Sequence, residues 1–129
     1  MRTKLAVLLA GMGLVCAMPV FAHHSVTAEY DSNKPIKIRG TVTKIEWTNP
    51  HSRMYVDVKQ PDGSVVNWNL ELTARSALVR QGWTSTTVKI GDEVSIEGIG
   101  ARTNVAGANA RSITLADGRK VLSGNNEQQ

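Results

Sequence analysis

Three histidines, His23, His24 and His51, are the side chains of this sequence whose type and position could bind a metal ion. Cleavage of the chain after Ala22 would make His23 the first residue, so that its free α-amino group and its imidazole could chelate one ion together. His51, in the turn 49–51, could supply a further nitrogen. Nitrogen-rich, tetragonal sites favour Cu(II) over other divalent ions. The histidines therefore predict a copper site built from the N-terminus and one loop.

The same histidines also have a simpler interpretation. His23 and His24 can belong to a flexible polar terminal segment, and His51 can do no more than brace its turn. A working site would need an acceptor to fix the ring of the loop histidine, and three carboxylates are candidates for this role: Glu29, Asp31 and Glu46. Both interpretations stay open at the level of the sequence.

The first 22 residues have the three-part layout of a cleavable export signal. Arg2 and Lys4 form a basic head, an apolar run follows, and residues 20–22 (Val-Phe-Ala) have the small or modest side chains that signal peptidase requires before its cleavage site. A second candidate cleavage site lies after Ala17. The apolar run is shorter than the roughly 20 residues that span a bilayer, so we expect cleavage rather than anchoring. We therefore predict a periplasmic protein that is not embedded in the membrane.

Processing changes the composition of the chain in two ways. Cys16, the only cysteine, is removed, so the mature chain has no thiol for a disulfide, a nucleophile or a metal site. Arg2 and Lys4 are removed as well, which leaves 107 residues with 13 basic and 11 acidic side chains. This length predicts one domain, and the near-neutral balance argues against nucleic acid as a partner.

The remaining polar residues do not form a recognisable catalytic set. Ser52 and His51 are neighbours, and on a strand neighbouring side chains point to opposite faces, away from the geometry of a nucleophile and its base. No Gly-rich phosphate loop is present in the sequence. Four acids are expected on the solvent-facing sides of their strands: Asp57, Glu71, Glu93 and Glu97. We therefore predict a protein that is not an enzyme.

Alternating apolar and polar residues predict β-strands along most of the mature chain. The alternation is clearest over 53–58, 66–72 and 93–97, and it gives each strand one buried and one solvated face. Five side chains are expected to be buried together: Val66, Trp68, Leu70, Val94 and Ile96. Because the best placed tryptophan belongs to this core, the sequence does not predict an aromatic platform for stacking bases.

The first strand, expected over 36–47, changes its parity part-way along. Gly40 lies within it, so we interpret the change as a bulge or a sharp bend. Pro61-Asp62-Gly63 and Asp117-Gly118 are typical of hairpin turns, and Gly91-Asp92 is expected to open the fourth strand.

One short helix is expected between the third and the fourth strand. Thr73 can serve as its N-cap, an apolar stripe follows over 74–78, Gly82 supplies a left-handed stop, and Trp83 can fold back on the helix end. A long bent first strand with a helix in this place is typical of the OB-fold. The predicted class is all-β with small α content, a five-stranded OB-like Greek-key barrel, and the alternative is another small barrel or sandwich.

Five short motifs span nearly all of the mature chain: Ala22-His23-His24-Ser25 followed by Glu29-Tyr30-Asp31, Glu46-Trp47-Thr48-Asn49-Pro50-His51, Arg80-Gln81-Gly82-Trp83, Gly91-Asp92-Glu93-Val94 and Leu115-Ala116-Asp117-Gly118-Arg119. On these residues the chain resembles an uncharacterised family of short secreted proteobacterial proteins, a domain of unknown function. The resemblance implies a periplasmic β-barrel and names no activity.

The sequence thus predicts four segments: a signal peptide at 1–22, an N-terminal arm at 23–35, an OB-like barrel at 36–122 and a disordered tail at 123–129. OB barrels usually bind at their rim loops, and six residues of two such loops, 48–52 and 102–111, are candidate ligand contacts: Asn49, Pro50, His51, Asn104, Asn109 and Arg111. The predicted function is a non-catalytic periplasmic binding or accessory module for an unidentified protein or small ligand. Copper binding through His23, His24 and His51 is the alternative, and copper is the one cofactor that the sequence suggests.

Overall fold

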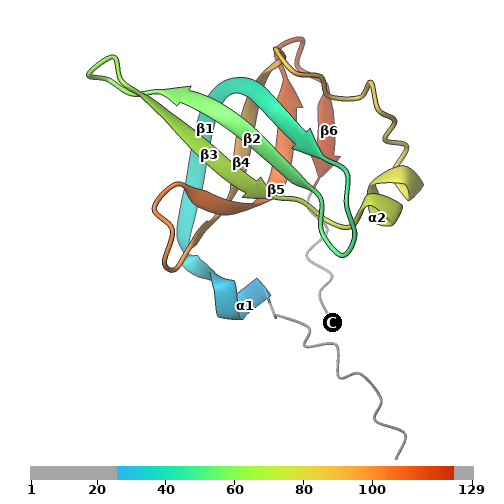
Figure 1. Cartoon of the computed structure of the whole chain (residues 1–129), viewed down its shortest axis with the longest axis horizontal. Coiled ribbons are helices and arrows are strands. Elements are labelled where there is room, and N and C mark those ends of the chain that lie inside the picture. Colours follow the sequence, from blue (N-terminus) through green and yellow to red (C-terminus); the bar gives the residue numbers. More distant parts are fainter. Residues whose placement is uncertain (1–25, 124–129) are drawn as a thin grey trace, which may run out of the picture.

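The computed structural model describes residues 26–123. Its elements follow one another along the chain (Figure 1) as α1 (Val26–Glu29), β1 (Tyr30–Glu46), β2 (Arg53–Lys59), β3 (Val65–Glu71), α2 (Arg75–Arg80), β4 (Glu93–Ala101), β5 (Gly107–Leu115) and β6 (Lys120–Ser123). The strand expected to begin at Ile36 begins at Tyr30. The predicted series of three strands, a helix and two strands is confirmed. The structure adds α1, and the second arm of the predicted last hairpin forms a short sixth strand, β6.

The strands form a sheet that closes on itself. Hydrogen bonds join them in the order β3-β2-β1-β4-β5-β6, and β3 also pairs with β5. This last pairing is parallel and joins 69–71 to 107–109, whereas the other pairings are antiparallel. Because β1 pairs with β4 along its first part and with β2 along its last part, it bends around the barrel (Figure 1). The closed ring with α2 between β3 and β4 confirms the predicted OB-fold.

The bend of β1 is made by a glycine and a bulge. A Cβ atom on Gly40 would lie 2.2 Å from the backbone oxygen of Asp57, so a residue with a side chain would force the two strands apart at this crossing. The register with β2 shifts between Val42 and Lys44. The parity change predicted in this strand is therefore a β-bulge that lies just beyond the glycine.

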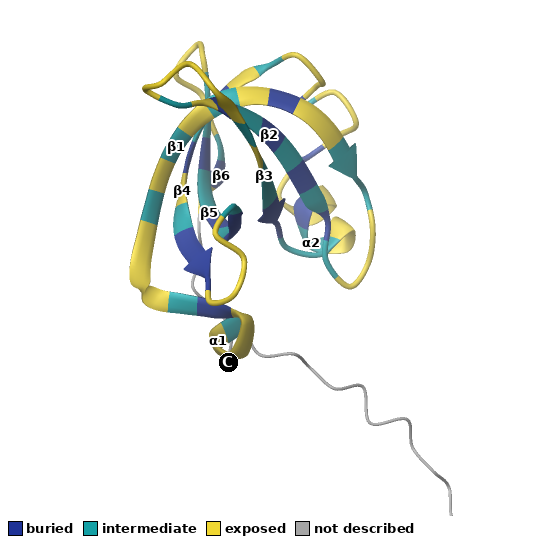
Figure 2. Cartoon of the chain, turned by 60° about the vertical axis from the view of Figure 1, so that its left-hand side comes forward, coloured by how far each residue is buried: buried dark blue, intermediate teal, exposed yellow. Residues whose placement is uncertain are grey.

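The core fills the inside of the barrel. Burial recurs at alternate residues along β2, where Met54, Val56 and Val58 are buried (Figure 2). Of the five predicted core residues, three are confirmed as buried: Leu70, Val94 and Ile96. Val66 and Trp68 are only partly buried. The reason is that β3 pairs with β5 only from residue 69 onward, so its earlier part forms an open edge from which Trp68 packs against the core.

The segment around α2 supplies a second part of the core. The predicted N-cap, Thr73, is wrong, because the residue before the helix is Ala74 and no side chain caps it. The predicted stop is confirmed, since Gly82 has a φ of +89°. Trp83 then folds back, donates its backbone N–H to the carbonyl of Leu78 at 3.0 Å, and is buried. Within residues 26–123, no helix is long and apolar enough to cross a membrane.

Both predicted hairpin turns are confirmed by their backbone hydrogen bonds. The amide of Gln60 donates to the carbonyl of Ser64 at 2.8 Å, which closes the turn between β2 and β3. The amide of Leu115 donates to the carbonyl of Arg119 at 2.9 Å, which closes the turn between β5 and β6. The first of these hairpins projects from the barrel away from α1 (Figure 1).

Candidate functional site

Glu71, the last residue of β3, is a buried carboxylate with a side chain that is 4% exposed. The expectation that it faces solvent is therefore wrong, whereas Glu93 and Glu97 are exposed as expected. The cause is the closure of the barrel, because Glu71 pairs with Arg53 of β2 on one side and with Asn109 of β5 on the other. A buried charge is costly unless it is paired, so the neighbours of Glu71 decide what the site can do.

Three side chains from different parts of the chain surround this carboxylate. The hydroxyl of Tyr30 donates to Oε2 of Glu71 at 3.0 Å. Nη2 of Arg53 lies 3.4 Å from the same oxygen, and Nδ1 of His51 lies 3.3 Å from Oε1. We call these four residues the Glu71 cluster. Within residues 26–123, no buried side-chain nitrogen or oxygen lacks a hydrogen-bond partner, and Arg53 supplies a positive charge to the buried carboxylate.

Tyr30 takes part in the cluster as a neutral donor. Burial, followed by the negative charge of Glu71, raises the pKa of Tyr30 above its usual value. The phenol therefore keeps its proton and directs it at the carboxylate. Because Tyr30 is the first residue of β1, this hydrogen bond fixes the start of the strand against the end of β3.

His51 is held in place by its loop and by Glu71. The hydroxyl of Thr48 donates to the carbonyl of His51 at 2.7 Å, and the hydroxyl of the buried Ser52 donates to the carbonyl of Thr48 at 3.2 Å. The Asn49–Pro50 peptide bond of this loop is cis. The Nδ1 atom of the ring faces Oε1 of Glu71, which directs the Nε2 atom away from this carboxylate.

The partner of His51 corrects an expectation from the sequence. The candidate acceptors were Glu29, Asp31 and Glu46, but the carboxylate beside the ring is Glu71. Glu46 accepts instead from the hydroxyl of Tyr55 at 3.3 Å. Asp31 lies 3.8 Å from Nη1 of Arg102. His51 is 38% exposed, so its ring links the buried carboxylate to the surface.

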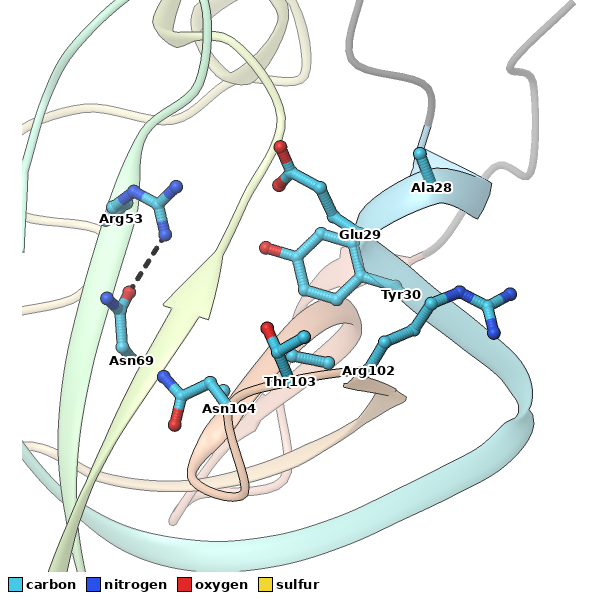
Figure 3. Close-up of a pocket in the computed structure, with 10 residues that line it drawn as sticks. Ala28, Glu29, Tyr30, Arg53, Asn69, Arg102, Thr103 and Asn104 are labelled. Atoms are coloured by element: carbon cyan, nitrogen blue, oxygen red, sulfur yellow. Dashed lines mark hydrogen bonds between the residues drawn. The ribbon is translucent and has the colours of Figure 1, made fainter.

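A pocket of about 290 Å³ lies beside the Glu71 cluster. We call it the mouth pocket, and it is lined by Ala28, Glu29, Tyr30, Arg53, Asn69, Ala101, Arg102, Thr103, Asn104 and Gly107 (Figure 3). Nη1 of Arg53 donates to Oδ1 of Asn69 at 3.1 Å, and the amide of Ala106 donates to Oδ1 of Asn104 at 3.1 Å. The side-chain oxygens of both asparagines thus accept hydrogen bonds within the protein, and their NH₂ groups are donors that can serve a ligand.

Arg102 fixes α1 as one wall of the mouth pocket. Its Nε donates to the carbonyl of Thr27 at 3.1 Å, and its backbone amide donates to the carbonyl of Glu29 at 3.0 Å. Its side chain points away from Arg53 and Asn69 (Figure 3). A small apolar cluster supports the same wall: Val26, Tyr30, Ile99 and Ala101. The pocket is therefore bounded by elements that hydrogen bonds and packing hold together.

The structure distributes the predicted site residues among several places. His51 belongs to the Glu71 cluster, Asn104 lines the mouth pocket, and Asn49 and Pro50 are exposed in their loop. Asn109 and Arg111 were predicted in a loop, and this is wrong. The loop between β4 and β5 covers only 102–106, so both residues lie in β5.

Two of the predicted metal ligands, His23 and His24, lie outside the described residues. In the part of the chain that the structure describes, no three or more His, Cys, Asp or Glu side chains are grouped so that they could hold a metal ion. Sequence reasoning missed Tyr30, Arg53, Asn69 and Glu71. Strand alternation alone gives no signal for them, because it cannot tell which polar face the closing barrel will cover.

The sequence pattern of one protein family matches residues 12–110. The chain belongs to DUF6152, a family of unknown function. This match covers the Glu71 cluster and the whole mouth pocket. No curated protein matches this DUF6152 chain.

Solved structures similar to this DUF6152 chain include two crystal forms of the mitochondrial single-stranded DNA binding protein Rim1 from S. cerevisiae. One form has a TM-score of 0.50 and 14% sequence identity, and it covers 64% of this chain and 93% of Rim1. The other has a TM-score of 0.50 and 15% identity, and it covers 71% of this chain and 97% of Rim1. At such low identity the likeness establishes the OB-fold and nothing about the ligand.

Proposed function

We propose that this protein is a non-catalytic, exported, periplasmic binding module that takes a small polar ligand in the mouth pocket. The observation that carries the proposal is the buried Glu71, which is held by Tyr30, His51 and Arg53 at the edge of that pocket. A buried ionic cluster is weak evidence for stability, because apolar residues would serve as well. Ionic clusters beside pockets are more often found at functional sites.

The charges around the mouth pocket favour a neutral ligand. The lining includes Glu29, Arg53 and Arg102. Arg53 faces the carboxylate of Glu71 and Arg102 faces that of Asp31, so both positive charges are already balanced. What the lining offers in addition is hydrogen-bond donors, among them the amide groups of the two asparagines. A neutral molecule with several hydroxyl groups, such as an oligosaccharide, matches this chemistry, and OB-folds are known to bind oligosaccharides.

The outer face of β1, β2 and β3 gives little support to nucleic-acid binding, although Rim1 is named for it. On this face, the ring of Tyr55 is already partnered, because the ammonium group of Lys44 lies 5.1 Å from its centre. The amide of Asn67 donates to Asp57 at 2.7 Å and to Thr43 at 3.2 Å. Binding of single strands usually needs several free aromatic rings on a positive groove. That the protein does not bind nucleic acid stays a prediction.

Titration with a trisaccharide of N-acetylglucosamine, followed by backbone-amide NMR, tests the proposed site. We expect shifts at Asn69, Asn104 and Gly107. We expect Asn69→Ala to weaken binding about tenfold through the loss of hydrogen bonds. Asn67→Ala is the matched control, because Asn67 lies on the same strand and face but outside the pocket. Shifts of the pocket residues by oligothymidylate and not by the saccharide would contradict the neutral-ligand proposal.

A second candidate function, copper binding, is favoured by the contact between His51 and Glu71. The contact at 3.3 Å directs Nδ1 toward the carboxylate and leaves Nε2 for an ion, which is the usual role of a carboxylate behind a metal-bound histidine. Tyr30 donates to the same carboxylate. α1 leads into Tyr30 from Val26, and His23 is three residues before Val26. Extended chain covers roughly 3.3 Å per residue, so this site requires the ring of His51 to lie within about 10 Å of Val26.

Titration with Cu(II) of protein whose intact mass shows that it begins at His23 tests this second candidate. We expect one tight, nitrogen-rich site that is lost on His51→Ala and on addition of one residue before His23. Glu71→Gln is expected to weaken it about 10–100-fold. A response to the added residue alone would describe an ordinary peptide terminus and would rule out the two-part site.

A further inference from the structure

Arg111 is not among the residues that line the mouth pocket. It lines a second depression on another surface of the barrel. This groove has a volume of about 460 Å³. We call it the Arg111 groove, and its lining residues come from the start of β1 and from β4, β5 and β6. Its polar lining residues are Ser32, Glu97, Arg111, Ser112, Lys120 and Ser123.

A β-bulge directs Arg111 to this place. Glu97 pairs with Ser112, whereas the next residue of β4, Gly98, pairs with Ala110, so Arg111 is the extra residue of β5. A Cβ atom on Gly98 would lie 2.1 Å from the backbone oxygen of Asn109. The glycine therefore permits the close approach of the two strands that accompanies the bulge. Bulges redirect side chains and are over-represented beside functional sites.

The positive charges of the groove are not balanced within the described residues. Neither Arg111 nor Lys120 forms an ion pair with any acid between residues 26 and 123. Glu97 is the carboxylate of the lining, and Nζ of Lys37 lies 3.0 Å from its Oε1. Lys37 thus balances Glu97, and Arg111 and Lys120 leave two positive charges of the lining without an acidic partner among the described residues. An anion that enters the groove therefore meets a net positive surface.

Hydroxyl groups surround these two cations. Ser32, Ser112 and Ser123 all line the groove, and their side chains have no hydrogen-bond partner among residues 26–123. Ser112 pairs with Glu97 on one neighbouring strand and with Ser123 on the other, so this row of polar side chains crosses three strands. Each hydroxyl can donate to an anionic oxygen.

We propose that the Arg111 groove binds a phosphate group. A guanidinium presents parallel N–H donors that match the oxygens of phosphate, an ammonium adds charge, and the serine hydroxyls complete the set of donors. This site is separate from the mouth pocket in both lining and ligand charge. It therefore does not depend on the function proposed for the Glu71 cluster.

Titration of the protein with inorganic phosphate at low ionic strength, followed by backbone-amide NMR, tests the proposal. We expect shifts at Ser112, Lys120 and Ser123, and a loss of affinity of about tenfold on Arg111→Gln. The matched control is Arg80→Gln, since Arg80 is exposed at the end of α2 and outside the groove. Equal losses for the two variants, or shifts spread over all basic residues, would overturn the proposal, because they describe non-specific attraction.

Two further arms identify the source of the phosphate. One uses glycerol phosphate in solution, and the other uses sedimentation with vesicles of phosphatidylglycerol compared with vesicles of phosphatidylcholine. If the protein binds only glycerol phosphate, and Arg111→Gln reduces this binding, the ligand is a small molecule that carries a phosphate. If it binds the anionic vesicles, and the same variant reduces that binding, the ligand is a lipid headgroup. If Arg111→Gln changes the binding of neither, the groove is not a phosphate site.

Discussion

Trp83→Ala is expected to lower the free energy of unfolding by about 3–5 kcal/mol, the range for removal of a large buried aromatic side chain. Trp83 is only 3% exposed. Its indole Nε1 donates to the carbonyl of Val121 in β6 at 2.7 Å, and its ring meets that of Trp47 edge-on with centroids 5.8 Å apart. The substitution thus leaves a cavity and removes a link between the segment after α2 and the last strand.

Urea denaturation measures this effect, with Trp68→Ala as the matched control. Trp68 lies at the open edge of β3 and is only partly buried. Its replacement is expected to cost less, roughly 1–2 kcal/mol, in proportion to the smaller area that leaves the core. If the two variants lose the same stability, the placement of Trp68 at an open edge is wrong.

Glu71→Ala is the second substitution with a large expected effect, a loss of about 3 kcal/mol in the free energy of unfolding. Its removal leaves the hydroxyl of the buried Tyr30 without an acceptor, deprives Arg53 of its counter-charge and removes the carboxylate that faces His51. This loss lies at the lower end of the roughly 3–5 kcal/mol that removal of one partner of a buried ion pair costs. The reason is that the Arg53 and His51 side chains are about one-third exposed, at 35% and 38%, and can regain water.

Glu93→Ala is the control for this measurement, because Glu93 pairs with Arg39 at an exposed site. Exposed ion pairs contribute little to stability, so the free energy of unfolding of the Glu93→Ala variant should stay close to that of the wild type. Glu71→Gln keeps an acceptor for Tyr30 and is expected to recover part of the loss. A Glu71→Ala variant as stable as Glu93→Ala would mean that the carboxylate is not held as the structure indicates.

The two proposed sites share one structural feature, the first part of β1. Tyr30 joins the Glu71 cluster, and Ser32 and Pro35 line the Arg111 groove. Tyr30 pairs with Ala101 and Pro35 with Ile99, with a register shift between them. Residues 30–35 of the predicted N-terminal arm therefore belong to a strand that carries residues of both sites.

Much of the fold could be predicted from the sequence because the information is local. In β2 the alternation of Met54, Val56 and Val58 with polar residues gives the strand and its buried face directly. Gly63 and Gly118 adopt positive φ in their turns, as the turn chemistry predicts. The OB-fold followed from the order of such elements, since few closed arrangements suit a long bent strand and a helix in that position.

What only the tertiary structure decided is which polar residues are withdrawn from water. Glu71 has the alternation of a solvent-facing residue, yet closure of β3 onto β5 buries it beside Tyr30, which is 41 residues away in the chain. Pairing of β5 with β4 likewise places Arg111, which was expected in a loop, in a strand as the extra residue of a bulge. Alternation tells which residues share a face of a strand. Which face is covered depends on contacts between strands far apart in the sequence, and no local pattern contains them.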